Sequence, residues 1–234
     1  MKTITFSHTG KRQTNQDSIL ISTLSSEKYL LIVADGMGGY SNGDIAAKLT
    51  NDVILSVLDG MNEINYDGIQ LAIDNSNVLL REKIEAIQSK MGATVGGIIL
   101  SKQNALCFWV GDVQIFHFRN NKLKFESKSH TLINEMKSTS IINDPDKIVK
   151  YKHIVTRSIN GDITNSTADF HLIEDLQKED LLIICSDGVH DIFSPIQIQQ
   201  ILNTSDNNQE AMSRIEKRLH NEASDNFSLI LIEV

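Results

Sequence analysis

The apolar residues of this chain fall into short runs separated by polar turns, and the spacing within each run predicts its structure. Tyr29–Ala34 and Leu181–Cys185 are continuous and rich in β-branched residues, and each is followed within two positions by Asp-Gly. Runs of this length and composition are typical of buried strands. A third run, Phe227–Ile232, has the opposite order, because Asp225 precedes it.

The order of strand and aspartate predicts where three carboxylates lie. If the last strand runs antiparallel to one of the other two, Asp35, Asp187 and Asp225 meet at one sheet edge. Gathered carboxylates repel one another, since two unit charges about 4 Å apart interact by about 4 kcal/mol at an effective dielectric of about 20. A divalent cation with oxygen ligands relieves that repulsion. The pattern therefore indicates a site for Mg²⁺ or Mn²⁺.

Apolar positions at helical spacing follow the first of these aspartates and precede the last. Residues 41–44 (Ser-Asn-Gly-Asp) offer an N-cap to the first helix. The predicted helices are Ile45–Leu58, Asp67–Ser89, Pro195–Leu202 and Gln209–Leu219.

Short strands fill most of the remaining chain. They are predicted at Ile19–Ser22, Gly92–Leu100, Ala105–Val110, Val113–Phe118, Lys122–Phe125, His153–Thr156 and Phe170–Ile173. Gly111-Asp112 and Asn120-Asn121 are typical two-residue hairpin turns, so the middle of the chain is interpreted as an antiparallel meander. His130–Tyr151 is polar and irregular, apart from a short helix predicted at Thr131–Lys137. We interpret residues 121–151 as a surface flap that sets substrate choice.

The order of elements predicts an α+β fold of two antiparallel sheets, with one pair of helices on each outer face. All 234 residues are expected to form a single domain, because no low-complexity linker interrupts the chain.

Composition and net charge argue against several classes of function. The formal net charge of -8 argues against non-specific binding to nucleic acid or to an anionic membrane. No apolar run approaches the ~20 residues of a membrane span, and the N-terminus lacks the apolar region of a signal peptide. Cys107 and Cys185 lie in apolar runs and are expected to be buried thiols. We therefore expect a cytoplasmic protein.

Two loop segments add candidate site residues. Next to the other carboxylates, Arg12 is a candidate phosphate ligand, because its guanidinium presents a fork of donors. Asp17 is a candidate for a further metal or water contact. Asp35 is followed by glycine at three of the next four positions, which lets the backbone approach closely, so the Gly36 carbonyl can add an oxygen to a metal shell. This glycine spacing is not that of a dinucleotide or P-loop motif.

Six motifs, taken in order, resemble those of the metal-dependent (PPM, or type 2C) protein serine/threonine phosphatases, especially their compact bacterial members. Each motif is weak alone, but six in this order are highly specific, and they span almost the whole chain. They are Arg12-x-x-Asn15-x-Asp17, Asp35-Gly36-Met37-Gly38-Gly39, Gly92-Ala93-Thr94, Trp109-Val110-Gly111-Asp112, Ser186-Asp187-Gly188 and Asp225-Asn226.

The resemblance implies a four-layer α-β-β-α sandwich, which agrees with the strand order above. It also implies that Asp35 bridges two Mn²⁺ or Mg²⁺ ions and that Gly36 supplies its carbonyl to one of them. By the same resemblance, Asp187 and Asp225 complete the shell of the other ion.

The implied reaction is hydrolysis of phosphoserine and phosphothreonine on proteins by a metal-activated water, without a phospho-enzyme. In this scheme Asp35 and Arg12 are the catalytic residues, and Arg12 holds the substrate phosphate. Asp17 is a further metal contact, and Asp112 helps to bind a third, weaker ion. The implied partners are phosphorylated proteins and a cytoplasmic serine/threonine kinase pathway.

The chain departs from the family pattern at several positions. Gln16 stands where many relatives have an acid, and Met37 where eukaryotic members have a histidine that can protonate the leaving group. Val113-Gln114 replaces Ser-Arg, and Ser129-His130-Thr131 replaces Asp-His-Ser. These departures motivate an alternative, a weak or inactive binding module on the same fold, although the retained aspartates argue against it. A phosphatase with an aspartyl nucleophile is disfavoured, because Met37 occupies the place of its second carboxylate.

Overall fold

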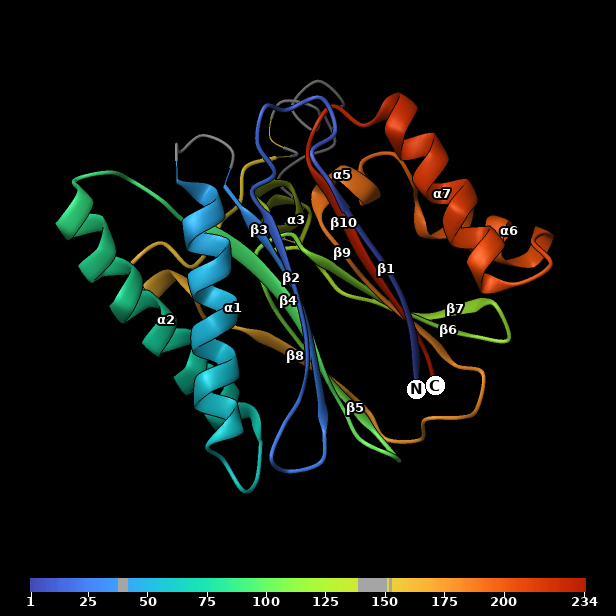
Figure 1. Cartoon of the computed structure of the whole chain (residues 1–234), viewed down its shortest axis with the longest axis horizontal. Coiled ribbons are helices and arrows are strands. Elements are labelled where there is room, and N and C mark those ends of the chain that lie inside the picture. Colours follow the sequence, from blue (N-terminus) through green and yellow to red (C-terminus); the bar gives the residue numbers. More distant parts are fainter. Residues whose placement is uncertain (38–41, 139–150, 152) are drawn as a thin grey trace.

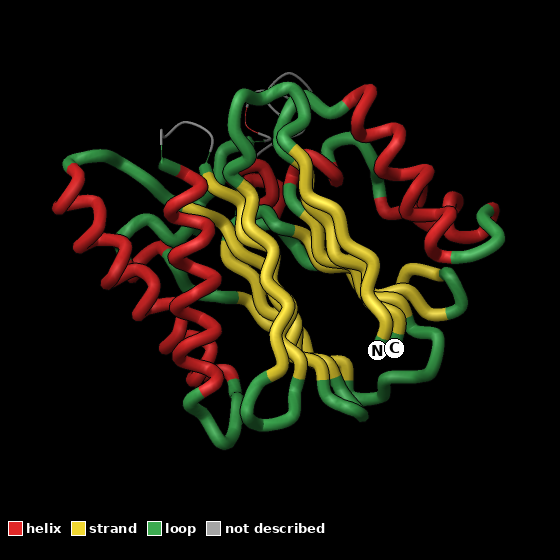
Figure 2. Tube along the Cα trace, in the orientation of Figure 1, coloured by secondary structure: helices red, strands yellow, loops and turns green. Residues whose placement is uncertain are grey.

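The computed structural model describes residues 1–37, 42–138, 151 and 153–234. Its core is a pair of antiparallel sheets of five strands each (Figures 1 and 2). The β10 sheet consists, in spatial order, of β1 (Lys2–His8), β10 (Phe227–Glu233), β9 (Leu181–Cys185), β6 (Gln114–Arg119) and β7 (Lys122–Glu126). The β3 sheet consists of β2 (Asp17–Thr23), β3 (Tyr29–Gly36), β4 (Ala93–Leu100), β5 (Ala105–Val110) and β8 (Asp169–Ile173).

Helix pairs cover the two outer faces (Figure 1). The pair on the β3 sheet is α1 (Gly43–Asp59) and α2 (Tyr66–Ile87), and the pair on the β10 sheet is α6 (Pro195–Thr204) and α7 (Asn208–Glu222). Within the described ranges, short helices lie in connections at α3 (Leu132–Ser138), η1 (Ile163–Asn165) and α5 (Asp187–His190). The predicted four-layer α-β-β-α sandwich is thus confirmed.

The continuous apolar runs arise because each central strand is buried on both faces. Successive side chains of a strand point to opposite sides. In β3, Leu30 and Ile32 pack under the helices, whereas Leu31 and Val33 pack between the sheets. The same division holds in β10, where Leu231 faces the helices and Ile230 faces the other sheet.

Some predicted connections are confirmed and others are wrong. Asn120 and Asn121 have φ of 51° and 53° and join the paired strands β6 and β7, as a type I′ hairpin requires. Gly111-Asp112 is not a hairpin turn, because β5 belongs to the β3 sheet and β6 to the β10 sheet. The predicted continuous meander is therefore broken at this point, where the chain crosses between the sheets.

Two further predictions about strands need correction. His153–Thr156 forms no strand and contributes only an isolated bridge between Thr131 and Val155. The edge strand β1 was not predicted, although Ile4 and Phe6 alternate with polar residues along it. It pairs with β10 along its whole length.

Several predicted features lie outside the described residues. These are residues 139–150 and 152, which include most of the predicted flap, and residues 38–41, which include Gly38, Gly39 and the first residue of the predicted helix cap. Within the described ranges, no helix combines the length and apolar character needed to cross a membrane.

Candidate active site

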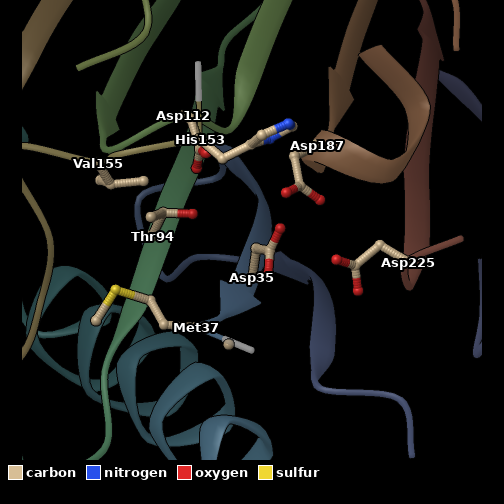
Figure 3. A pocket seen from close by; sticks show the side chains of 9 residues that line it. Asp35, Met37, Thr94, Asp112, His153, Val155, Asp187 and Asp225 are labelled. Atoms are coloured by element: carbon tan, nitrogen blue, oxygen red, sulfur yellow. The ribbon is translucent and has the colours of Figure 1, made fainter. Parts of the chain in front are cut away.

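Four aspartates line one cavity of about 260 Å³ at one end of the sandwich: Asp35, Asp112, Asp187 and Asp225. Asp35 lies at the end of β3, Asp187 begins α5 directly after β9, and Asp225 precedes β10. Figure 3 shows the carboxylates of Asp35, Asp187 and Asp225 turned toward a common space. The predicted convergence is therefore present, but it is not at one sheet edge, because Asp35 comes from the β3 sheet and the other two come from the β10 sheet.

Asp17 lies behind this cavity rather than in its wall. It is opposite Asp35 in the register of β2 and β3. Its Oδ2 accepts a hydrogen bond of 2.8 Å from Ser186 Oγ, whereas its Oδ1 is buried without a protein partner among the described residues. Burial raises the pKa of Asp17 to about 6, against the opposing effect of hydrogen bonds from Ser228 and Ser186.

Two other carboxylates of the cluster, those of Asp35 and Asp187, are destabilised by burial and by neighbouring charges. Burial raises the pKa of Asp35 well above its usual range, and Asp17 and Asp187 add Coulomb repulsion. Burial likewise raises the pKa of Asp187, with repulsion from Asp112 and Asp225. Among the described residues that line the cavity there is no lysine or arginine, so a bound cation would supply positive charge that the lining lacks.

The donor set fits divalent cations that prefer oxygen. The cavity lining offers four carboxylates, the ligand type of Mg²⁺ and Mn²⁺, and the unpartnered Asp17 Oδ1 is a further available oxygen. Among the described residues, no three of these carboxylates bring their oxygens within 4.8 Å of one another. The cluster is therefore more open than the shell of a single ion.

Gly36 allows α1 to begin directly against the end of β3. A Cβ atom at this position would lie 2.4 Å from the Gly43 carbonyl and 2.7 Å from Gln16 O. Gly36 N donates to Gln16 O at 3.1 Å, and Gly36 itself lines the cavity. The close approach expected of this glycine is thus observed.

Arg12 lies at the edge of the cluster, on the loop between β1 and β2. Its Nη2 donates to Asp225 Oδ2 at 2.6 Å, and this hydrogen bond raises the pKa of Arg12 further. Arg12 lines a neighbouring polar pocket that shares Asp225 with the aspartate cavity. The structure thus places a cation beside the carboxylate cluster.

Asn226 holds the Arg12 loop in place. Its side-chain amide donates to Thr9 O at 2.8 Å and to Thr14 O at 2.9 Å, and its Oδ1 accepts from Gln16 N at 2.9 Å. These three bonds fix both ends of the loop to the start of β10. The sequence signal for this residue is its place directly after Asp225, but no role was predicted for it.

Several residues that contact the site were given no role from the sequence. Thr94 and His153 line the aspartate cavity. His190, the last residue of α5, has Nε2 3.0 Å from the carbonyl oxygen of Asp112 and so helps to position that loop. No spacing rule connects His153 to the aspartates, because tertiary contacts alone bring it into the cavity, whereas His190 lies three positions after Asp187 in α5.

Comparison with known proteins gives consistent results along nearly the whole chain. The model of the family described as protein phosphatase 2C matches residues 6–226. The serine/threonine phosphatase stp of Listeria welshimeri is 24% identical over 233 residues, covering 95% of this chain and 91% of that protein. Protein phosphatase PhpP of Streptococcus pneumoniae is 28% identical over 203 residues, covering 84% and 81%. The catalytic domain of the serine/threonine protein phosphatase PstP, solved in complex with 2 manganese ions, superposes with a TM-score of 0.82 at 21% identity, covering 99% and 97%.

Proposed function

Since this chain belongs to the protein phosphatase 2C family, we propose that its aspartate cavity carries out the metal-dependent hydrolysis of phosphoserine and phosphothreonine in proteins. The observation that carries the proposal is the convergence of Asp35, Asp187 and Asp225, from two sheets, on one cavity. The manganese ions of the PstP catalytic domain support metal dependence in this fold.

We assign the metal ligands to the acidic cluster and one backbone carbonyl. They are Asp17, Asp35, Gly36, Asp112, Asp187 and Asp225. The open spacing of the carboxylates supports two ions rather than one, with a third, weaker ion at Asp112. When bound, such ions lower the pKa of a water molecule between them toward neutrality and polarise the phosphoryl oxygens.

The residues of the chain itself bind and orient the substrate phosphate. Arg12 supplies paired N–H donors beside the cluster, and bidentate donation of this kind suits phosphate oxygens. Asn226 keeps the loop that carries Arg12 against Asp225, so the donors remain at the mouth of the cavity.

The substrates are phosphorylated proteins, and the enzyme opposes a serine/threonine kinase pathway in the cytoplasm. The whole chain acts as one catalytic domain. The net charge of -8 is compatible with a protein substrate and unfavourable to nucleic acid.

Activity of the Asp35→Asn variant tests the proposal. With Mn²⁺ and a phosphothreonine peptide, we expect the wild-type protein to release phosphate and EDTA to abolish release. Asp35→Asn should lower the rate by at least about 100-fold, the scale of losing one preorganised charge at a reacting centre. Phosphate release and circular dichroism together separate loss of activity from loss of fold.

The matched control is Asp175→Asn, which makes the same charge change at a carboxylate that is 81% exposed. It should hydrolyse the peptide at the wild-type rate. A wild-type protein that binds Mn²⁺ but releases no phosphate would instead identify a binding module. Full activity in Asp35→Asn would refute the metal assignment.

A further inference from the structure

A second group of potential metal ligands lies where α7 packs against the end of β1. Among the residues that the structure describes, His8, Glu216 and His220 each offer one ligand atom, and the three atoms lie within 4.8 Å of one another. None of the three lines the aspartate cavity or the Arg12 pocket. The group is therefore separate from the proposed catalytic centre.

The fold brings these side chains together through two elements. His8 is the last residue of β1, whereas Glu216 and His220 are four positions apart on α7. Residues with this spacing share one face of a helix. The helix therefore presents a carboxylate and an imidazole toward the imidazole at the strand end.

Aromatic packing orients both imidazoles. The rings of His8 and His220 have centroids 4.4 Å apart, and each lies next to the buried ring of Phe227, at 5.2 Å and 5.3 Å. His8 Nε2 is 2.6 Å from Glu216 Oε1. The side chains of His8 and Glu216 remain 35% and 34% exposed, so an ion can reach them.

Two imidazole nitrogens and one carboxylate oxygen form a donor set that Zn²⁺ binds, with the fourth position open. Mg²⁺ and Ca²⁺ instead select oxygen. Tetrahedral ligands at about 2.1 Å from the ion lie about 3.4 Å from one another. The present atoms reach that spacing by shifts of roughly an ångström in partly exposed side chains. We propose that His8, Glu216 and His220 bind a transition-metal ion, Zn²⁺ by preference, with one coordination position left to water or another ligand.

The competing description is a hydrogen-bonded pair, His8 and Glu216, that packs beside His220 without an ion. Titration of Zn²⁺ into the whole protein, in a large excess of Mg²⁺ that occupies the oxygen-ligand sites, distinguishes the two. Affinity is read by competition with a zinc-binding dye, and Co²⁺ serves as a spectroscopic substitute. We expect one Zn²⁺ per chain that Mg²⁺ does not displace, and visible Co²⁺ absorption of a four-coordinate site.

Variants locate the bound ion. Glu216→Gln and His220→Gln should each weaken Zn²⁺ binding by at least about tenfold, because loss of a ligand costs no less than loss of an outer partner. Glu222→Gln, on the same helix and with the same charge change, should bind like the wild type, as should the aspartate-cavity variant Asp187→Asn. Absence of Mg²⁺-resistant Zn²⁺ binding, retention in both ligand variants, or loss in Asp187→Asn would each overturn the proposal.

Discussion

Ionisation of Asp35 is opposed both by burial and by the other carboxylates of the site. Burial raises its pKa well above the usual range, and the charges of Asp17, Asp187, Asp112 and Asp225 add to that effect. At neutral pH and without cations, the ionised cluster therefore opposes folding. The residue that we propose as a metal ligand is therefore a source of instability in the metal-free protein.

Removing this one charge should stabilise the metal-free protein. We expect Asp35→Asn to melt at a higher temperature than the wild type in EDTA at neutral pH, because repulsion inside the cluster falls. Each 1 kcal/mol gained corresponds to a rise in Tm of about 2–4 °C in a domain of this size. Thermal unfolding followed by circular dichroism measures the change, and an equal or lower Tm would show that the cluster is not under electrostatic strain.

The aspartates of the cavity could be predicted from single residues, whereas their partners could not. Asp35 lies at the end of one apolar strand, Asp187 follows another by two positions and Asp225 precedes a third by two, so three strand ends alone predicted that these aspartates lie together. His153 and Asn226 reach the site through the path of their loops. Local spacing contains no information about that path.

At the scale of elements, the sequence predicted strands well and their partners less well. The φ values of Asn120 and Asn121 follow from residue type, because asparagine tolerates the left-handed region. Gly111-Asp112 has the same turn chemistry but leads into the opposite sheet. The two turns differ in whether the strand that follows pairs with the strand before it. This depends on which sheet buries the next strand, and that is a property of the assembled sandwich.

An ion pair joins two neighbouring strands of the β10 sheet. Arg119, the last residue of β6, donates through Nε and Nη2 to the two carboxylate oxygens of Asp180 at 2.8 Å and 2.7 Å, and Asp180 directly precedes β9. Burial alone would raise the pKa of Asp180, but the Arg119 hydrogen bonds and the Gln177 backbone N–H lower it below its usual range.

This ion pair predicts a pH-dependent contribution to stability. Because the folded-state pKa of Asp180 lies below the unfolded value of about 4, the ionised carboxylate stabilises the fold above that pH, and the contribution is lost as the pH falls through the folded-state pKa. We expect Asp180→Asn to lower the free energy of unfolding at pH 7, and the deficit to shrink as the pH falls below about 4.

Urea unfolding of both proteins across this pH range measures the deficit. Asp175→Asn is the control, because its carboxylate is exposed and lies 3.9 Å from Arg119, where an ion pair contributes little. A deficit that stays constant with pH would mean that the charge of Asp180 does not stabilise the strands.

At the scale of the whole molecule, the site belongs to neither sheet alone. Asp35 comes from the β3 sheet, whereas Asp187 and Asp225 come from the β10 sheet. Fully buried aliphatic side chains such as Val33 and Ile184 fill the space between the sheets. Cations bound by these carboxylates, as proposed, would therefore tie together the two halves of the sandwich.

Divalent cations should accordingly stabilise the whole fold. At about 100 times its Kd, an ion that binds only the folded protein raises the free energy of unfolding by about 2.7 kcal/mol. We expect Mn²⁺ to produce a rise of this size in the wild type and little or none in Asp35→Asn, measured by urea unfolding with and without the ion. Equal stabilisation of both proteins would place the bound ions elsewhere.

Because Arg12 contacts Asp225, we expect anion binding at Arg12 to affect cation binding at Asp225. The guanidinium is 2.6 Å from the carboxylate, so an anion that approaches Arg12 competes with Asp225 for the same donors. A cation bound to Asp225 would release the Arg12 guanidinium to bind an anion. Conversely, an anion bound to Arg12 would release the Asp225 carboxylate to bind a cation. Because such coupling is reciprocal, each ligand raises the affinity of the other by the same factor. We therefore expect metal ion and phosphate to bind cooperatively.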